Sequence, residues 1–209
     1  MIISYELGNS LYINLTNRCS NACDFCLRCA KPKQVKPVWV TSADLSGAEE
    51  FWLEREPSVS EIIDDLKRRD LKKYHEVVFC GFGEPFMRFD ECVEVAKWLK
   101  TQGVKIRVNT NGQANLIHGR DVTGEMAGLF DTVSISLNNK NAEEYNNICH
   151  SDYGEEAYNA LLEFGEKCAA RGIKTVFTVV DILPPEDIQK CREIAESRGG
   201  TLRIRKYIN

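Results

Sequence analysis

The sequence predicts an α/β fold: an open, partial (β/α)6 barrel with one additional strand from an N-terminal hairpin. Short apolar runs alternate with helical runs from Ser58 to the end of the chain. Repeated βα units force parallel strands joined by right-handed crossovers. About six such strands are fewer than the eight of a closed barrel. A flat, doubly wound sheet is the alternative that this alternation leaves open.

The N-terminal segment predicts a β-hairpin. Ile2 to Leu7 and Leu11 to Thr16 are rich in strand-forming residues, and Gly8-Asn9 between them is a turn signal. The second arm leads directly into a cysteine-rich loop. The stretch from Arg28 to Pro57 contains prolines and no sustained period, so we expect an irregular flap there.

Regular elements follow from Ser58 onward. Helices are expected where a helical period coincides with start or stop signals, such as the capping box Ser58-x-x-Glu61 and the stop at Gly103. The predicted helices are 58–66, 89–102, 123–130, 155–170 and 185–198. The predicted strands between them are 77–80, 105–109, 132–137, 174–182 and 201–207.

Length and composition limit the classes of protein. We expect residues 1–209 to form a single domain. The net charge of −4 disfavours nucleic acid as a partner but leaves it open, and we expect no membrane association. The N-terminus has neither a secretory signal nor a long apolar run, which predicts a cytoplasmic protein. A basic cluster at Arg28, Lys31, Lys33 and Lys36 is either a solvated loop or a phosphate contact.

The cysteines indicate a metal site. Nine cysteines, an odd number clustered towards one end, suit a reducing compartment. Cys19-x3-Cys23-x2-Cys26 lets three thiolates converge on a cuboidal iron–sulfur cluster and leaves one iron without a protein ligand. Cys29 could add a fourth ligand. The alternative is therefore a closed, ferredoxin-like or zinc-binding module without enzymatic activity, using Cys19, Cys23, Cys26 and Cys29.

A glycine-rich turn follows the next predicted strand. In Gly81-Phe82-Gly83-Glu84-Pro85 the glycines permit close backbone approach to a ligand. The carboxylate of Glu84 and the peptide carbonyls can accept hydrogen bonds from an ammonium group.

The strand faces predict a polar barrel interior. Apolar residues alternate with Ser134, Ser136 and Asn138, with Arg107 and Asn109, and with Arg203 and Arg205. If the helices cover the apolar faces, the interior is polar and partly cationic, which suits a charged ligand. For Arg203 and Arg205 the alternative is protection of an edge strand against pairing.

Together, the cysteine loop and the Gly81–Pro85 turn resemble the motifs of the radical S-adenosylmethionine (SAM) superfamily. The segments 14–28 and 53–57 look most like the short radical SAM proteins associated with TatD-type nucleases. The resemblance implies a [4Fe-4S] cluster on Cys19, Cys23 and Cys26. It also implies reductive cleavage of SAM to a 5′-deoxyadenosyl radical, which abstracts hydrogen from an unidentified substrate.

The same resemblance implies a set of SAM contacts. Phe25 stands at a position that is usually aromatic, and Phe82 replaces the second glycine of the Gly-Gly-Glu-Pro motif. The contacts implied are Phe25, Gly81, Phe82, Gly83, Glu84, Asn109, Thr110, Ser136, Asn138 and Val180. No residue is assigned a catalytic role, and His118, Cys149 and His150 are left unassigned.

Two narrower enzyme alternatives fit the size of the chain: a 7-carboxy-7-deazaguanine synthase-like enzyme and a glycyl-radical-activase-like enzyme. Absence of a second cysteine cluster within the sequence disfavours peptide-modifying enzymes with auxiliary clusters. The expected partners are an electron donor such as flavodoxin or ferredoxin, with a functional link to a TatD-type nuclease.

Overall fold

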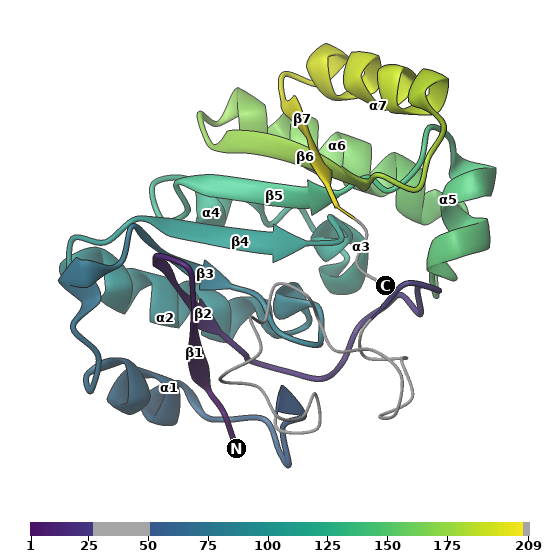
Figure 1. Cartoon of the computed structure of the whole chain (residues 1–209). Helices are drawn as coiled ribbons and strands as arrows, with labels where there is room; N and C mark the ends of the chain where they lie inside the picture. Colours follow the sequence, from purple (N-terminus) through teal and green to yellow (C-terminus); the bar gives the residue numbers. More distant parts are fainter. Residues whose placement is uncertain (27–50, 207–209) are drawn as a thin grey trace.

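The computed structural model describes residues 1–26 and 51–206 (Figure 1). Its seven strands form one sheet in which neighbours follow the order of the chain. The first pair is antiparallel and every later pair is parallel. The strands are β1 (Ser4–Leu7), β2 (Ser10–Ile13), β3 (Glu76–Phe79), β4 (Ile106–Thr110), β5 (Thr132–Ser136), β6 (Lys174–Val180) and β7 (Thr201–Arg205).

This order confirms the partial barrel. A doubly wound sheet reverses its strand order at a switch point, and no reversal occurs here. Because β1 and β7 do not pair with each other, the sheet is not closed. The hairpin is also confirmed, since Leu7 pairs with Ser10 across a turn in which Gly8 has φ +58°.

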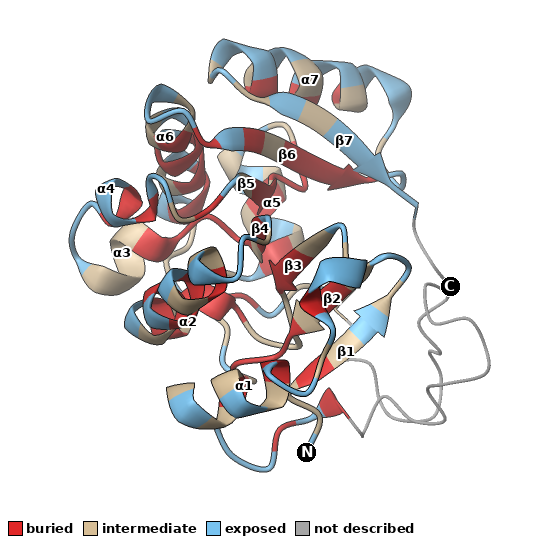
Figure 2. Cartoon of the chain, turned by 90° about the vertical axis from the view of Figure 1, so that its left-hand side faces the viewer, coloured by how far each residue is buried: buried red, intermediate tan, exposed pale blue. Residues whose placement is uncertain are grey.

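The helices lie on the outer side of the sheet (Figures 1 and 2). They are α1 (Val59–Leu66), α2 (Phe89–Thr101), α3 (Ala114–His118), α4 (Thr123–Met126), α5 (Ala142–Cys149), α6 (Glu156–Ala170) and α7 (Pro185–Ser197). Two short 3-10 helices, η2 (Leu71–Lys73) and η3 (Pro85–Arg88), precede β3 and α2. The predicted capping box of α1 is present, with Ser58 and Glu61 each capping the other's backbone N–H.

The region after β4 differs from the prediction. The expected helix 123–130 ends as α4 at Met126, because Gly128 adopts φ +77° and the chain turns to bury Phe130. The helices α3 and α5 were not predicted. α5 buries only Tyr145 and Cys149, which is too little apolar periodicity to indicate a helix from the sequence.

The apolar core lies between the sheet and the helices. Val133 and Ile135 of β5 and Leu137 directly after it are fully buried on that side, as the alternation predicts. The Phe86 ring contacts Phe130 and other core rings, and apolar burial of this kind is the main stabilising contribution to folding. None of the described helices is long and apolar enough to cross a membrane. Most of the flap predicted over residues 28–57, with the basic cluster and Cys29, lies outside the described residues.

Candidate functional site

A cavity of about 420 Å³ opens on the concave side of the sheet. This volume is within the range of small-molecule sites. The three motif cysteines line it together with almost every predicted SAM contact: Phe25, Gly81, Phe82, Gly83, Glu84, Asn109, Thr110, Ser136 and Asn138. Val180 does not line it, and Thr178 of the same strand does. Residues far apart in the sequence thus meet in one place, as the motifs predict.

The cysteine loop is fastened to the end of α5 by backbone hydrogen bonds. The amide of Ala22 donates to the carbonyl of Cys149 (2.9 Å), and that of Asp24 donates to Ile148 (3.0 Å). A third bond runs from the amide of Asp152 to the carbonyl of Ser20 (2.8 Å). The loop that carries the three thiols therefore has a fixed backbone course on one side.

A buried polar network supports the loop from below. The amide group of Gln113 donates to the Tyr145 hydroxyl (3.1 Å) and to Asn21 Oδ1 (2.8 Å), and it accepts from the Ser20 hydroxyl (2.7 Å). Asn111 Nδ2 also donates to Ser20 Oγ (2.9 Å). No local sequence pattern links these residues, so the motifs did not indicate the network.

Hydrogen bonds and burial affect the thiols of the loop differently. Cys19 Sγ accepts a hydrogen bond from the amide of Asn21 (3.4 Å), and hydrogen bonds to sulfur favour the thiolate. Cys23 shares a hydrogen bond with Cys149. This bond and burial raise the pKa of Cys23, whereas the same bond lowers the pKa of Cys149 although burial opposes that shift. No group of three metal-binding side chains for a single ion occurs among the described residues. A cuboidal cluster binds each thiolate to a different iron, so its ligands need not meet at one point.

The glycine turn packs against the stem of the cysteine loop. The amide of Gly83 donates to the Thr16 carbonyl (2.9 Å), and that of Glu84 donates to the Arg18 carbonyl (2.8 Å). A Cβ atom on Gly83 would lie 2.3 Å from the Thr16 oxygen. One on Gly81 would lie 2.0 Å from Asn14 Oδ1. The glycines are therefore required by contacts within the protein, in addition to any ligand approach.

Glu84 joins the turn to the end of β4. Its buried carboxylate accepts hydrogen bonds from the Thr110 hydroxyl (2.7 Å), the Asn111 amide (2.6 Å) and the Phe86 amide (3.1 Å). Burial raises the pKa of Glu84 to about 6, although these donors oppose the shift. The side chain holds the Asn109–Gly112 turn in place, and the peptide carbonyls of the glycine turn remain the candidates for an ammonium ligand.

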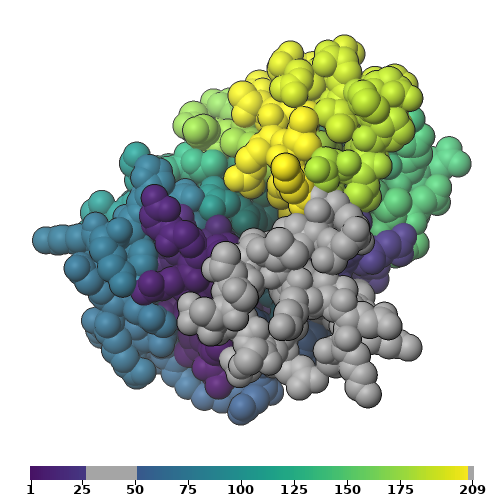
Figure 3. Space-filling view, in the orientation of Figure 1, coloured from purple at the N-terminus to yellow at the C-terminus, as the bar shows by residue number. Residues whose placement is uncertain are grey.

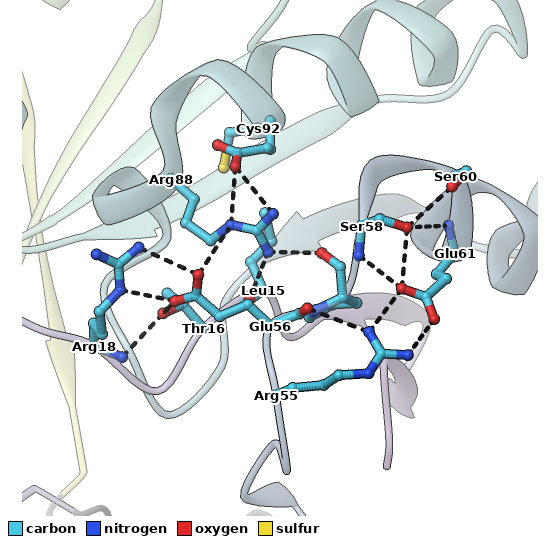
Figure 4. A network of polar contacts seen from close by, with 12 residues as sticks. Leu15, Thr16, Arg18, Arg55, Glu56, Ser58, Ser60, Glu61, Arg88 and Cys92 are labelled. Carbon is cyan, nitrogen blue, oxygen red and sulfur yellow. Dashed lines mark hydrogen bonds and ion pairs between the residues drawn. The ribbon is translucent and has the colours of Figure 1, made fainter.

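The run Leu53–Pro57, singled out in the sequence, clamps the same stem (Figure 4). The Glu56 carboxylate accepts from the Thr16 hydroxyl (2.6 Å) and from Arg18 Nε (2.8 Å). Burial tends to raise the pKa of Glu56, yet these two bonds and the charge of Arg88 lower it. Buried Arg88 donates to the carbonyls of Leu15 (3.0 Å) and Pro57 (2.8 Å), which joins this run to η3.

Phe82 has a packing role that explains its departure from glycine. Its ring lies 6.1 Å from the Phe51 ring and 6.3 Å from the Trp52 ring, between centroids. Phe51 in turn meets Tyr5 edge-on at 4.9 Å. An aromatic wall of Tyr5, Phe51 and Phe82 therefore lines the cavity on the side of β1, and the ring of Phe82 packs within it.

Asn138 carries an unsatisfied polar atom. Its Nδ2 donates to Cys149 Sγ (3.3 Å), whereas its buried Oδ1 has no hydrogen-bond partner within the described structure. Its backbone is left-handed, with φ +58°. A buried orphan acceptor at a cavity wall fits a ligand with hydrogen-bond donors, and SAM carries such donors on its ammonium, ribose and adenine groups.

The three unassigned residues occupy different surroundings. His118 Nε2 lies 2.8 Å from the Phe86 carbonyl, below η3, and does not line the cavity. His150 lies 2.7 Å from Asp24 on an exposed part of the cysteine loop. Cys149 lies beneath the loop beside Cys23. Cys149 and His150 thus contact the candidate cluster loop, and His118 does not.

Comparison with known proteins agrees with this geometry. The family model of the radical SAM superfamily matches residues 13–197. A candidate glycyl-radical enzyme activating enzyme of Methanocaldococcus jannaschii is 28% identical over an alignment of 147 residues, and the match covers 66% of this chain and 57% of that protein. The chain thus spans little more than half the length of this curated relative.

Solved structures share the fold. Streptococcus suis SuiB bound to S-adenosylmethionine gives a TM-score of 0.70 at 12% identity, covering 97% of this chain and 41% of that chain. Methylornithine synthase (PylB) gives a TM-score of 0.63 at 12% identity, covering 95% of this chain and 53% of that chain. The superfamily match covers most of the chain and implies a [4Fe-4S] cluster and SAM as cofactors. This chain belongs to the radical SAM superfamily.

Proposed function

We propose that the protein is a radical SAM enzyme that generates a 5′-deoxyadenosyl radical and uses it to abstract hydrogen from a substrate. With the cluster and SAM bound, the cofactors supply one electron and a carbon–sulfur bond that breaks to give this radical. The observation that carries the proposal is the shared cavity. Cys19, Cys23 and Cys26 line it beside the Gly81–Glu84 turn, with room for a ligand between them.

The residues of the chain hold and orient the reactants. Cys19, Cys23 and Cys26 would hold three irons, and the carbonyls of the Gly81–Glu84 turn would accept hydrogen bonds from the SAM ammonium. Asn138 Oδ1 would accept from a ribose or amino group of SAM. Holding both partners in one geometry lowers the entropic cost of the reaction. Phe25 and Phe82 would limit the access of water.

Among the more specific enzyme classes, a glycyl-radical-activase-like enzyme has one observation in its favour. The curated relative with that description is 28% identical over 147 residues. A 7-carboxy-7-deazaguanine synthase-like reaction and membership of the TatD-associated group rest on sequence resemblance alone. We also propose flavodoxin or ferredoxin as the electron donor, because the reaction consumes an electron that the substrate does not provide.

The test is spectroscopic and uses anaerobically reconstituted full-length protein. The electron paramagnetic resonance signal of the reduced cluster should change when SAM is added, and dithionite should cause slow release of 5′-deoxyadenosine. Cys23→Ala should abolish both responses, whereas Cys29→Ala should preserve them. If the signal of the bound cluster does not change when SAM is added, or if the protein binds zinc in place of iron, the proposal is contradicted and the closed binding module is favoured.

A further inference from the structure

Two arginines on the inner face of β7 have no part in the proposed SAM contacts. Arg203 and Arg205 both line the cavity. Leu202, which precedes Arg203 in the alternation, packs against the apolar core on the opposite side of the sheet, next to α7. Edge strands carry charges that prevent pairing with another chain, so the position of the arginines on β7 is not by itself evidence for a ligand. The evidence comes from the charge balance of the cavity.

Arg107 is the third cationic side chain that lines the cavity, and a carboxylate of the protein already neutralises its charge. Arg107 Nη2 lies 2.8 Å from the carboxylate of Glu76. By contrast, neither β7 arginine forms an ion pair with any residue in 1–26 or 51–206. Arg203 donates only to the Ser134 hydroxyl (3.3 Å) among those residues.

The surroundings disfavour these positive charges. Burial and the charge of Arg107 lower the pKa of Arg203. Burial also lowers the pKa of Arg205, and the charge of Arg203 adds to the effect. Both residues are exposed, so the barrel wall removes only part of the hydration of their side chains. Partly dehydrated cations without a carboxylate partner fit an anionic ligand, because an anion would compensate the lost hydration.

Their place in the sheet separates the two arginines from the proposed SAM contacts on β4 and β5. The proposed side-chain contacts with SAM that line the cavity come from the cysteine loop, the turn after β3, β4 and the end of β5. Val180 of β6, which pairs with Arg205, does not line the cavity. β7 lies two strands beyond β5, which corresponds to about 10 Å at ordinary strand spacing. Figure 3 shows β7 (yellow) and the N-terminal strands (purple) on two sides of a hollow. The arginines therefore line a part of the cavity that the proposed contacts on β4 and β5 do not use.

We propose that Arg203 and Arg205 bind an anionic group of the substrate, a phosphate or a carboxylate. The inference rests on the proposed function, since the substrate must share the cavity with SAM. The two residues are spaced i and i+2 on one face, roughly 7 Å apart along the strand, so their long side chains can close on one group. A guanidinium donates two parallel hydrogen bonds to either oxyanion.

The first test measures anion binding directly. Reconstituted full-length protein with SAM is titrated calorimetrically with inorganic phosphate and, separately, with acetate. The anion that binds identifies the group. The double variant Arg203→Gln and Arg205→Gln should bind it at least about tenfold more weakly. Arg68→Gln removes an exposed arginine after α1 and should match the wild type.

The second test needs no variant and so does not depend on folding. Phenylglyoxal labels arginines in the wild-type protein, and mass spectrometry follows the labelling rate at each site. The bound anion should slow labelling of Arg203 and Arg205 several-fold and leave Arg68 unchanged.

The inference is overturned if neither anion binds, if the double variant binds as the wild type does, or if SAM alone protects both arginines from labelling. The last outcome would mean that they hold SAM itself. The paramagnetic response to SAM, recorded on the same samples, tests the proposed function separately. We expect the double variant to keep that response.

Discussion

The side-chain amide of Asn21 donates a hydrogen bond of 2.9 Å to the hydroxyl of Tyr145, a residue 124 positions later in the chain. Both side chains are buried. The bond ties the loop between the first two cluster cysteines to α5. The same hydroxyl accepts from Gln113, so one oxygen atom serves two donors.

Tyr145→Phe should loosen the cysteine loop. The substitution leaves the buried donors of Asn21 and Gln113 without their acceptor, so we expect the free energy of unfolding to fall by about 1–3 kcal/mol. Iron should also dissociate faster from the reconstituted protein. Urea unfolding measures the first effect, and the rate of iron transfer to a chelator measures the second.

Tyr158→Phe is the matched control. Its ring centroid lies 5.7 Å from that of Tyr145, and its hydroxyl donates to the Asn139 carbonyl (3.3 Å), away from the cysteine loop. This variant should lose some stability and keep the wild-type rate of iron release. Equal rates of iron release in both variants would contradict a role for Tyr145 in holding the loop.

Gly83→Ala should disrupt the contact between the glycine turn and the stem of the cysteine loop. The new methyl group would lie 2.3 Å from the Thr16 oxygen and 2.4 Å from that of Arg18, both on backbone that cannot swing away. We expect a loss of several kcal/mol, as for severe overpacking, or no folded protein. Thermal unfolding followed by circular dichroism is the measurement.

Gly124→Ala provides the contrast. This residue lies in α4, its φ is not positive, and a Cβ atom would meet only Arg171 Nε at 3.8 Å. Alanine should raise stability by roughly 0.5–1 kcal/mol through helix propensity. Similar destabilisation of both variants would show that the close approach at Gly83 is unimportant.

Glu84 should make stability depend on pH. Its pKa in the folded protein is about 6, above its ordinary value of 4.5. The folded state therefore holds the proton more tightly than the unfolded state. The resulting stabilisation is fully present below pH 4.5 and is lost as the pH rises through 6. Its size is about 2 kcal/mol, from the difference between the two pKa values.

The measurement is urea unfolding of the wild type and Glu84→Gln between pH 4.5 and 7. The wild type should lose about 2 kcal/mol relative to the variant over this range. Glu94→Gln, which removes an exposed carboxylate on α2, controls for the change in net charge. A difference between wild type and Glu84→Gln that does not vary with pH would refute the shifted pKa.

Asn138→Gly should separate folding from cofactor binding. Glycine adopts the left-handed φ of +58° without strain, so the fold should be kept. The unsatisfied Oδ1 of this cavity-lining residue is lost, and we expect SAM to bind about tenfold more weakly. Equilibrium dialysis with labelled SAM measures this.

His150→Gly tests the specificity of that effect. His150 is the other non-glycine residue with positive φ among the described residues, and it does not line the cavity. SAM affinity should stay close to the wild-type value, since an exposed ion pair such as His150–Asp24 contributes little. Unchanged affinity in Asn138→Gly would remove this residue from the proposed SAM contacts.

The sequence predicts those features that depend on local patterns. The cysteine spacing, the capping box of α1 and the two faces of β5 are each encoded within a few neighbouring residues. The helix α5 was missed because it is stabilised by two buried residues and by Asn141 at its N-cap. The network of Ser20, Asn21, Gln113 and Tyr145 was missed for another reason. Its hydrogen bonds join residues about 90 or more positions apart or cross between elements, and no local rule indicates them.

The glycine turn shows a related limit. Its motif indicated approach to a ligand, whereas the contacts of Gly81 and Gly83 with Asn14, Thr16 and Arg18 are internal. A requirement for glycine is visible in the sequence, but the group that makes it necessary depends on which segments the fold brings together. The same holds for Glu84, whose three hydrogen-bond donors all belong to the protein.

The backbone bonds between the cysteine loop and residues 148–152 set an order for maturation of the protein. The three thiols leave the ribosome early, but the segment that fixes their backbone is synthesised much later. A nascent chain therefore displays three cysteines without their final arrangement. Stable insertion of iron and sulfide must follow the assembly of the first five strands and α5, so cofactor delivery acts on a largely folded apoprotein.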